Sequence, residues 1–192
     1  MWYGILICES AAKIYGLLKN PSYFRSMSSR FIIGVMGPGE NATPDENELA
    51  FNLGSAIARQ GWITLTGGRA FGVMDAAMKG ATEEGGFTIG VVPGDSEKGS
   101  SPHASIKIIT GMGGARNSIN ILSSHVIVVC GMSAGTASEV ALAIKADKRI
   151  ILLNLDDVTI QFFKKIGTYK ITLAKTIDET IALIKNFLSV YG

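Results

Sequence analysis

Three glycine-rich segments contain the residues best suited to hold a ligand. They span residues 34–39, 66–72 and 131–136. Glycine lets the backbone approach a ligand closely and point unpaired amide groups at it, and a helix that starts just afterwards favours negative charge. A phosphate or a comparable oxyanion is therefore the expected guest. The candidate binding residues in these segments are Gly37, Pro38, Gly39, Gly67, Gly68, Arg69, Gly72, Gly131, Ser133, Gly135 and Thr136.

Charged and polar side chains next to these segments extend the expected site. Arg69 lies within the second segment, and Arg116, followed by Asn117, lies at an expected helix start in the run 110–117. Both arginines are suited to bidentate contacts with an anion. Glu139 lies one helical turn beyond Thr136, so its carboxylate either faces the same cleft or strengthens the dipole of its own helix. The sequence leaves both interpretations of Glu139 open.

Several other chemistries are disfavoured by the same residues. No glycine-rich segment is followed by Lys and then Ser or Thr, which argues against nucleotide triphosphate hydrolysis at a P-loop. His103 and His125 are too isolated to form a metal pair, so no metal site is expected. Cys8 and Cys130 lie far apart in unlike contexts, which predicts neither a disulfide nor a zinc site and makes Cys130 a small core residue.

These residues must be positioned by strands and helices. Along the chain, short apolar runs alternate with segments of helical periodicity, which is typical of βαβ units. Most runs are apolar on successive residues, as in parallel strands covered by helices on both faces. The predicted fold class is therefore α/β, a three-layer Rossmann-like fold with a mostly parallel sheet. The three glycine segments then meet at its carboxyl edge, where ligands bind. The expected strands span 31–36, 62–66, 87–92, 106–109, 126–129, 150–153 and 169–173.

The first expected helix has a complete start signal, with Thr43 as N-cap, Pro44 in the first helical position and Glu46 closing a capping box. Gly61 is expected to end this helix. Later helices are predicted from Val73 to Ala81, from near Gly114 with Ile119 and Leu122 inward, from Thr136 to Ala146, and over residues 160–166 and 177–188.

Length and composition limit the domain organisation. The 192 residues are predicted to form a single domain over residues 31–192, preceded by an extension over residues 1–30. This extension is expected to be a surface segment or an overlong start, with Met27 as an alternative first residue, rather than a targeting segment.

Charge and hydropathy limit the expected partners. The 18 basic and 16 acidic residues are intermixed, so nucleic acid is not an expected partner. No apolar run approaches the roughly 20 residues needed to cross a bilayer, and we expect a protein of the reducing cytoplasm that does not enter the membrane. The hydrophobic content of 47% and the mean hydropathy of +0.29 predict a homo-oligomer.

Together the motifs resemble the lysine-decarboxylase-like, Lonely Guy-type family of Rossmann proteins. The matching stretches lie at 33–39, 65–69, 72–74, 89–94, 110–113 and 131–139. The wider family more often has a third glycine at the position of Arg69. An arginine at this position resembles the branch of the family that carries the molybdenum cofactor. This resemblance implies a tetramer that binds molybdopterin with its molybdenum, or a molybdenum oxyanion such as molybdate. It further implies that the cargo passes unchanged to molybdenum enzymes or cofactor-insertion proteins.

The resemblance also implies an enzymatic alternative. Lonely Guy-type phosphoribohydrolases use an arginine and the glutamate of a Gly-Gly-x-Gly-Thr-x-x-Glu motif to cleave a base from a nucleoside monophosphate, and Arg116 and Glu139 match these positions. The glycine pair of that motif is altered at Ser133 and Ala134, and Asn117 stands where lysine is usual. A nucleotide-binding sensor shares every loop and is a third interpretation.

Overall fold

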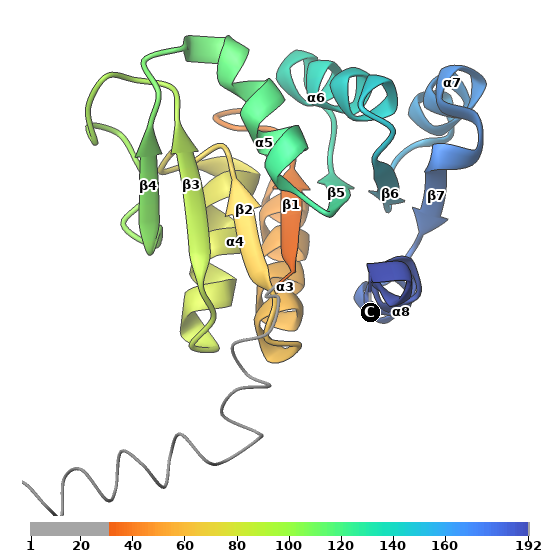
Figure 1. Cartoon of the computed structure of the whole chain (residues 1–192), viewed down its shortest axis with the longest axis horizontal. Coiled ribbons are helices and arrows are strands. Elements are labelled where there is room, and N and C mark those ends of the chain that lie inside the picture. The colour runs from red at the N-terminus through yellow and green to blue at the C-terminus, as the bar shows by residue number, and fades with distance from the viewer. Residues whose placement is uncertain (1–30, 192) are drawn as a thin grey trace, which may run out of the picture. The chain divides into compact units, whose positions relative to one another are not determined.

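The computed structural model describes residues 31–191, and within them seven strands form one sheet in the order β4-β3-β2-β1-β5-β6-β7. All neighbouring strands run parallel. The strand order reverses between β1 and β5, because β2 to β4 extend the sheet in one direction and β5 to β7 in the other (Figure 1). The strands are β1 (Ile32–Met36), β2 (Ile63–Thr66), β3 (Thr88–Val92), β4 (Ile106–Ile109), β5 (Val126–Cys130), β6 (Arg149–Leu153) and β7 (Ile171–Ala174).

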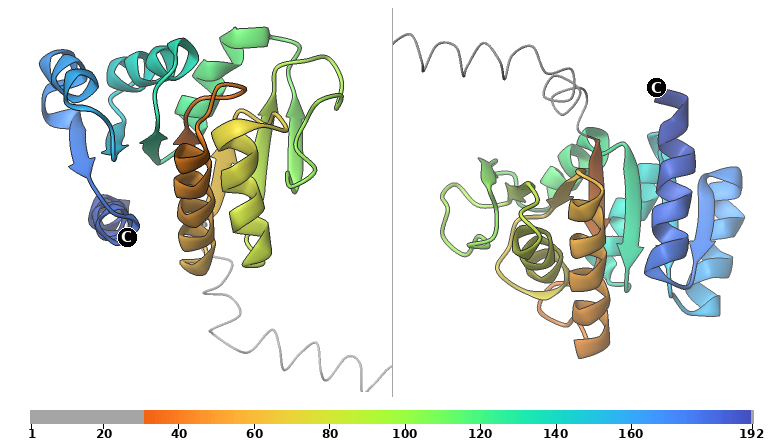
Figure 2. Two further views of the ribbon diagram at one scale, coloured as in Figure 1. Left: turned by 180° about the vertical axis from the view of Figure 1, so that it is seen from behind. Right: turned by 90° about the horizontal axis from the view of Figure 1, so that it is seen from below.

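Helices cover both faces of the sheet. One face packs against α3, α4 and α8, and the other against α5, α6 and α7 (Figure 2). These layers confirm the predicted three-layer α/β fold. The helices are α3 (Pro44–Arg59), α4 (Gly72–Glu83), α5 (Asn117–Ser123), α6 (Ala134–Lys145), α7 (Asp157–Gly167) and α8 (Ile177–Leu188), with short 3-10 turns η1 (Gly113–Arg116), η2 (Thr168–Lys170) and η3 (Ser189–Tyr191).

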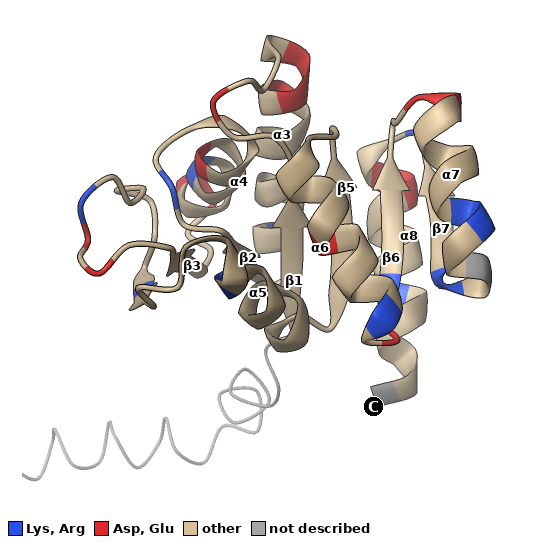
Figure 3. Ribbon diagram, turned by 90° about the horizontal axis from the view of Figure 1, so that it is seen from above, with Lys and Arg blue, Asp and Glu red and all other residues tan. Residues whose placement is uncertain are grey.

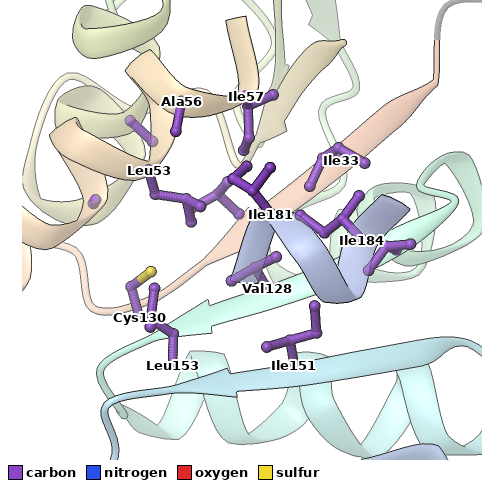
Figure 4. Close-up of a cluster of buried hydrophobic side chains, with 14 of the residues drawn as sticks. Ile33, Leu53, Ala56, Ile57, Val128, Cys130, Ile151, Leu153, Ile181 and Ile184 are labelled. Atoms are coloured by element: carbon purple, nitrogen blue, oxygen red, sulfur yellow. The ribbon is translucent and has the colours of Figure 1, made fainter. Parts of the chain in front are cut away.

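Successive residues of the central strands are apolar because their side chains point alternately to the two faces of the sheet, and helices cover both faces. In β6, Ile151 packs towards α3 and α8, whereas Leu152 packs towards α6 and α7. Both side chains are almost completely buried. The first of these layers is seen in Figure 4, where Ile151 and Val128 of the sheet face Ile184 of α8.

Helix α3 begins and ends as its sequence predicts. The backbone N–H of Thr43 donates to Glu46 Oε2 at 2.8 Å, and the backbone N–H of Glu46 donates back to Thr43 Oγ1 at 3.2 Å. This reciprocal pair satisfies amide groups that have no partner inside the helix. At the other end, Gly61 takes a φ of +73°, a left-handed conformation that glycine adopts without strain.

Helices α3 and α4 touch through their backbones. A Cβ atom built on Gly54 of α3 would collide with the carbonyl oxygen of Ala77, and one built on Gly80 of α4 would collide with that of Phe51. Only glycine at both positions permits this spacing. The two helices that follow the first two glycine segments are thereby held against each other.

The helix expected from near Gly114 differs from its prediction. A 3-10 turn, η1, comes first, and α5 starts only at Asn117. Leu122, expected to point inward, is 65% exposed, whereas Asn120 and Ile121 are buried. With about 100° between successive residues, a helix that buries Asn117 and Ile121 must turn Leu122 outward.

The edge strand β4 is the least covered part of the sheet. Ile106 and Ile108 are 44% and 41% exposed, because none of the helices described within residues 31–191 packs closely over this strand. No helix within residues 31–191 is both long enough and apolar enough to span a membrane. The predicted extension over residues 1–30, with Cys8 and Met27, lies outside the described residues.

Candidate functional site

The three glycine segments line one cleft of about 400 Å³ at the point where the strand order reverses. They reach it from the carboxyl ends of β1, β2 and β5, as expected for a ligand site in an open parallel sheet. Asn117 and Arg116 enter from the start of α5. The predicted site residues that line the cleft are Gly37, Pro38, Gly39, Gly67, Arg69, Arg116, Asn117, Ser133, Gly135, Thr136 and Glu139.

Three further predicted residues lie beside the cleft but do not line it. Gly68 packs against the backbone of Gly90, and Gly72 packs so closely on the first glycine segment that a Cβ atom would collide with the carbonyl oxygen of Gly39. Gly131 lines a neighbouring cleft, next to the Glu46 carboxylate. All three glycines have positive φ angles, a conformation that other residues rarely adopt, so their role is to permit the backbone turns beside the cleft.

Arg116 supplies a buried cation to the cleft. Its side chain is held by Asn117, whose Oδ1 accepts a bond from Nη1 at 2.6 Å. The Nε–H group is buried and has no hydrogen-bond partner. A Cβ atom on Gly67 would lie 2.6 Å from Nη2, so the absence of a side chain there makes room for the guanidinium. Unmet donors of this kind favour an anionic ligand.

Arg69 lies at the rim of the same cleft. Its guanidinium carbon is 4.4 Å from the centre of the Phe71 ring, and Nη2 is 3.6 Å from Glu40 Oε1. Burial lowers the pKa of Arg116, the charge of Glu139 opposes this shift, and the nearby Arg69 adds to it. The two guanidinium groups therefore act on the same space, which raises its affinity for negative charge.

Glu139 faces the cleft, which favours the first of its two interpretations. It is only 7% exposed, and its Oε1 accepts a hydrogen bond from Asn120 Nδ2 at 2.9 Å. Burial raises the pKa of Glu139 to about 6, while the bond from Asn120 and the charge of Arg116 work in the opposite direction. At neutral pH the cleft thus contains one buried carboxylate beside its two arginines.

The N-terminus of α6 forms the remaining wall. Ser133 caps the helix by accepting from the backbone N–H of Thr136 at 3.2 Å, and its hydroxyl is 2.9 Å from Thr136 Oγ1. Asn117 Nδ2 donates to Ser138 Oγ at 2.9 Å, which joins this helix to the Arg116 segment. Free amides of the first turn and the helix dipole both favour an anion here.

Comparison with known families shows to which family the chain belongs. The model of the SLOG cluster4 family matches residues 30–181. The chain belongs to this family. It also matches a cytokinin riboside 5'-monophosphate phosphoribohydrolase from Mycobacterium marinum, at 36% identity over 64 residues, which is 33% of this chain and 34% of that protein.

Solved structures give longer matches. The molybdenum cofactor binding protein of the phototrophic bacterium Rippkaea orientalis is 45% identical, with a TM-score of 0.82 and coverage of 84% of this chain and 99% of that one. The molybdenum cofactor carrier protein of Chlamydomonas reinhardtii is 48% identical, with a TM-score of 0.80 and the same coverage. These matches confirm the resemblance inferred from the glycine motifs.

Sequence reasoning missed several cleft residues of this SLOG cluster4 member. Phe71, Met74, Glu40 and Asn41 line the cleft, and Asn120 holds Glu139 from behind. Phe71 lies within the second glycine-rich segment, two residues after Arg69, and this position was the signal that could have identified it. Asn120 lies within an expected helix, where nothing in the sequence separates an inward asparagine from a surface one.

Cys130, which the sequence predicts to be a small core residue, lies in the core, and His125 makes a backbone contact. Cys130 is fully buried in the core, and burial, aided by the charge of Glu46, raises the pKa of its thiol to about 12, so it is unreactive. His125 Nδ1 accepts a hydrogen bond from the backbone N–H of Ile32 at 3.0 Å. Within residues 31–191, no group of three or more His, Cys, Asp or Glu side chains could hold a metal ion.

Proposed function

We propose that this protein binds the molybdenum cofactor, protects it and passes it on without chemical change. Two of the solved structures that it matches, at 45% and 48% identity over 84% of the chain, are proteins named for binding or carrying this cofactor. This similarity extends across the segments that form the cleft, because the alignments cover nearly all of both relatives. The cargo is therefore inferred from the comparisons, and its mode of binding from the cleft.

The observation that carries the proposal is the buried guanidinium of Arg116, whose Nε–H has no partner and which lines a cleft of three glycine segments. Molybdopterin ends in a phosphate monoester, and such a dianion matches unmet guanidinium and backbone donors. Arg69, at the rim, supplies a second positive charge. The residues present thus fit the phosphate end of the cargo.

The rest of the lining suits a carrier. Met36, Phe71 and Met74 give the cleft an apolar part next to its charged part. Molybdopterin carries a dithiolene that is readily oxidised, and contact with apolar side chains keeps water and oxidants away from it. Holding such a group needs grip and shielding, and no step of chemistry is required of the protein.

The cofactor carried by the purified protein provides the test. Protein from molybdate-fed cells, isolated without oxygen, is expected to contain pterin that fluoresces after oxidation, together with molybdenum. Arg116→Ala should lose most of both, whereas Arg59→Ala, which removes an exposed arginine at the far end of α3, should lose neither. Wild-type protein free of pterin under these conditions would contradict the proposal.

A second candidate function is supported by Glu139. A buried carboxylate with a pKa of about 6 beside an arginine is suited to acid–base or charge-stabilising work. This alternative is a phosphoribohydrolase that cleaves the base from a nucleoside 5'-monophosphate with Arg116 and Glu139. Free adenine released from adenosine monophosphate by the wild-type protein, and abolished in Glu139→Gln, would favour the enzyme over the carrier.

The same proposal includes a cellular setting. As a carrier, the protein would act in the cytoplasm as a homo-tetramer and deliver its cargo to molybdenum enzymes or to cofactor-insertion proteins. The exposed isoleucines of β4 and the exposed Leu122 of α5 support self-association, because side chains of this kind are usually covered in the working assembly.

A further inference from the structure

We propose that Ser101 and Asp75 are positioning residues that hold Arg69 in place at the cleft, through the connection between β3 and β4. Neither residue lines the cleft. The inference rests on the proposed function in one respect, which is that Arg69 contacts an anionic ligand. It adds to that function a part of the chain that the glycine motifs do not include.

The connection between β3 and β4 runs beside the Arg69 segment and is bonded to it on both sides of Arg69. The backbone N–H of Ser101 donates to the carbonyl of Gly68 at 2.9 Å, and that of Ala70 donates to the carbonyl of Gly99 at 3.1 Å. Arg69 and Ser100 thereby form an isolated antiparallel bridge. The backbone on either side of Arg69 is thus fixed by residues 99–101.

Ser101 anchors this bridge to helix α4. Its side chain is completely buried, and its hydroxyl donates to Asp75 Oδ1 at 2.6 Å. Asp75 lies in the first turn of α4, the helix that follows the Arg69 segment. The same hydroxyl accepts a hydrogen bond from the backbone N–H of His103 at 3.1 Å, so it both donates and accepts within the protein. A buried hydroxyl bonded to a carboxylate is a strong local constraint.

Arg69 needs such an external support because its own side-chain contacts are weak. The side chain is 46% exposed, its ion pair with Glu40 is 3.6 Å long, and its guanidinium carbon lies 4.4 Å from the centre of the Phe71 ring. Exposed ion pairs of this kind hold a side chain poorly. Within the segment, the one side-chain bond to its backbone is from the N–H of Gly68 to Thr66 Oγ1 at 3.1 Å. The direction of Arg69 therefore depends on the bridge to residues 99–101 as well as on its contact with Phe71.

The other end of the same connection supports the second arginine. The backbone N–H of Gly111 donates to the carbonyl of Gly94 at 2.8 Å, and that of Gly113 donates to the carbonyl of Pro93 at 2.9 Å. Gly113 begins η1, the turn that ends at Arg116. A single connection between strands is therefore bonded to both arginine-bearing segments, which fixes their separation across the cleft.

The test combines ligand binding with amide exchange in the full-length protein. Inorganic phosphate is the probe, titrated by calorimetry into wild type, Ser101→Ala, Arg69→Ala and the double variant. Ser101→Ala should weaken phosphate binding roughly threefold to tenfold, and the loss should disappear in the Arg69→Ala background. An equal loss in both backgrounds would overturn the proposal, because Ser101 would then act independently of Arg69.

Amide hydrogen exchange tests the positioning without any ligand. The amide of Ala70 should exchange faster in Ser101→Ala than in wild type, and unchanged exchange would overturn the proposal. Ser55→Ala is the matched control, since Ser55 is equally a buried serine, bonded to the carbonyl of Gly80 at 3.1 Å away from the cleft, and it should leave Ala70 unaffected. If wild type fails to bind phosphate, the anion site is refuted, while the exchange result still decides the positioning role.

Asp75 offers a second route if Ser101→Ala does not fold. Asp75→Ala removes the acceptor and should reproduce both effects, whereas Asp75→Asn keeps an oxygen that accepts from Ser101 and should retain near wild-type affinity. Equal losses in Asp75→Asn and Asp75→Ala would contradict the proposal, because the acceptor geometry would then have no part in the effect.

Discussion

Arg69 and Arg116 contribute to the same cleft from different surroundings. Arg116 is 8% exposed and its Nε–H lacks a partner, whereas Arg69 is stacked on Phe71 at the rim. A buried donor without a partner gains a full hydrogen bond when an anion arrives, since it gives up no contact with water. The buried arginine should therefore govern affinity, and the rim arginine should assist capture.

We expect Arg116→Ala and Arg69→Ala each to weaken cofactor binding while leaving the fold intact. A charge-assisted contact contributes roughly 1.5 to 3 kcal/mol, so each loss should lower affinity about tenfold to a hundredfold. Retained pterin after purification measures the loss, and circular dichroism checks the fold. Full retention of pterin by both variants would refute phosphate capture by the arginines.

The Glu139→Gln variant should show the effect of the buried carboxylate on stability. Because its pKa in the folded protein is raised from 4.5 to about 6, the ionised form is disfavoured in the fold. The stabilising contribution of the protonated carboxyl is complete below about pH 4.5 and is lost as the pH rises through about 6. Glu139→Gln should therefore gain up to about 2 kcal/mol over wild type at about pH 8 and nothing at about pH 4.

Urea unfolding at the two pH values provides the measurement. The same variant should hold the cofactor as well as wild type or slightly better, because an anionic ligand no longer meets a carboxylate. A loss as large as in the arginine variants would count against a carrier. A stability gain that is equal at both pH values would show that ionisation of Glu139 is not its cause.

At the scale of elements, the sequence predicted most of what positions the site. Six of the seven strands and the start of α3 lie where alternation, capping and glycine punctuation place them. The seventh, β7, begins at Ile171, two residues after its predicted start, because the 3-10 turn η2 occupies Thr168–Lys170. The prediction that Leu122 points inward was wrong, because α5 buries Asn117 and Ile121 and so turns Leu122 outward. Asn120 and Ser101 could not be predicted, because their roles arise from partners that the fold brings in from 19 and 26 residues away.

The capping box of α3 allows a direct test of an element. Thr43→Ala removes the acceptor for the Glu46 backbone N–H and should lower the free energy of unfolding by about 1 kcal/mol. Thr43→Ser keeps a hydroxyl there and should cost much less. The shift in urea midpoint at a constant slope gives the value. Equal destabilisation by Ala and Ser would mean that the methyl group of Thr43, and not the cap, is responsible.

At the scale of the molecule, both signs of charge are distributed along the elements (Figure 3), while apolar residues are exposed on β4 and α5. We expect a homo-oligomer, with the tetramer as the favoured state. Light scattering at micromolar concentration should report a multiple of the 20.3 kDa chain. Substituting Ile108→Lys should reduce the mass if β4 is in the interface, and a wild-type monomer would refute self-association.

We also expect a shortened chain that begins at Met27 to fold and bind as the full chain does. The seven described strands, the capping box and the described lining of the cleft lie within residues 31–191. Thermal unfolding and retained pterin should match those of the full chain. Loss of binding with an unchanged melting temperature would assign residues 1–30 a part in holding the ligand.

The backbone contacts between α3 and α4, at Gly54 against Ala77 and at Gly80 against Phe51, bear on the thermodynamics of binding. Because the two helices are in backbone contact, they cannot slide or separate without losing close packing. Helices α3 and α4 directly follow the first two glycine segments along the chain. These walls are therefore set before any ligand arrives, and little conformational entropy is lost on association. Affinity then depends chiefly on how long the anion stays on its donors, so in the proposed carrier a recipient would act on release of the cargo and not on its capture.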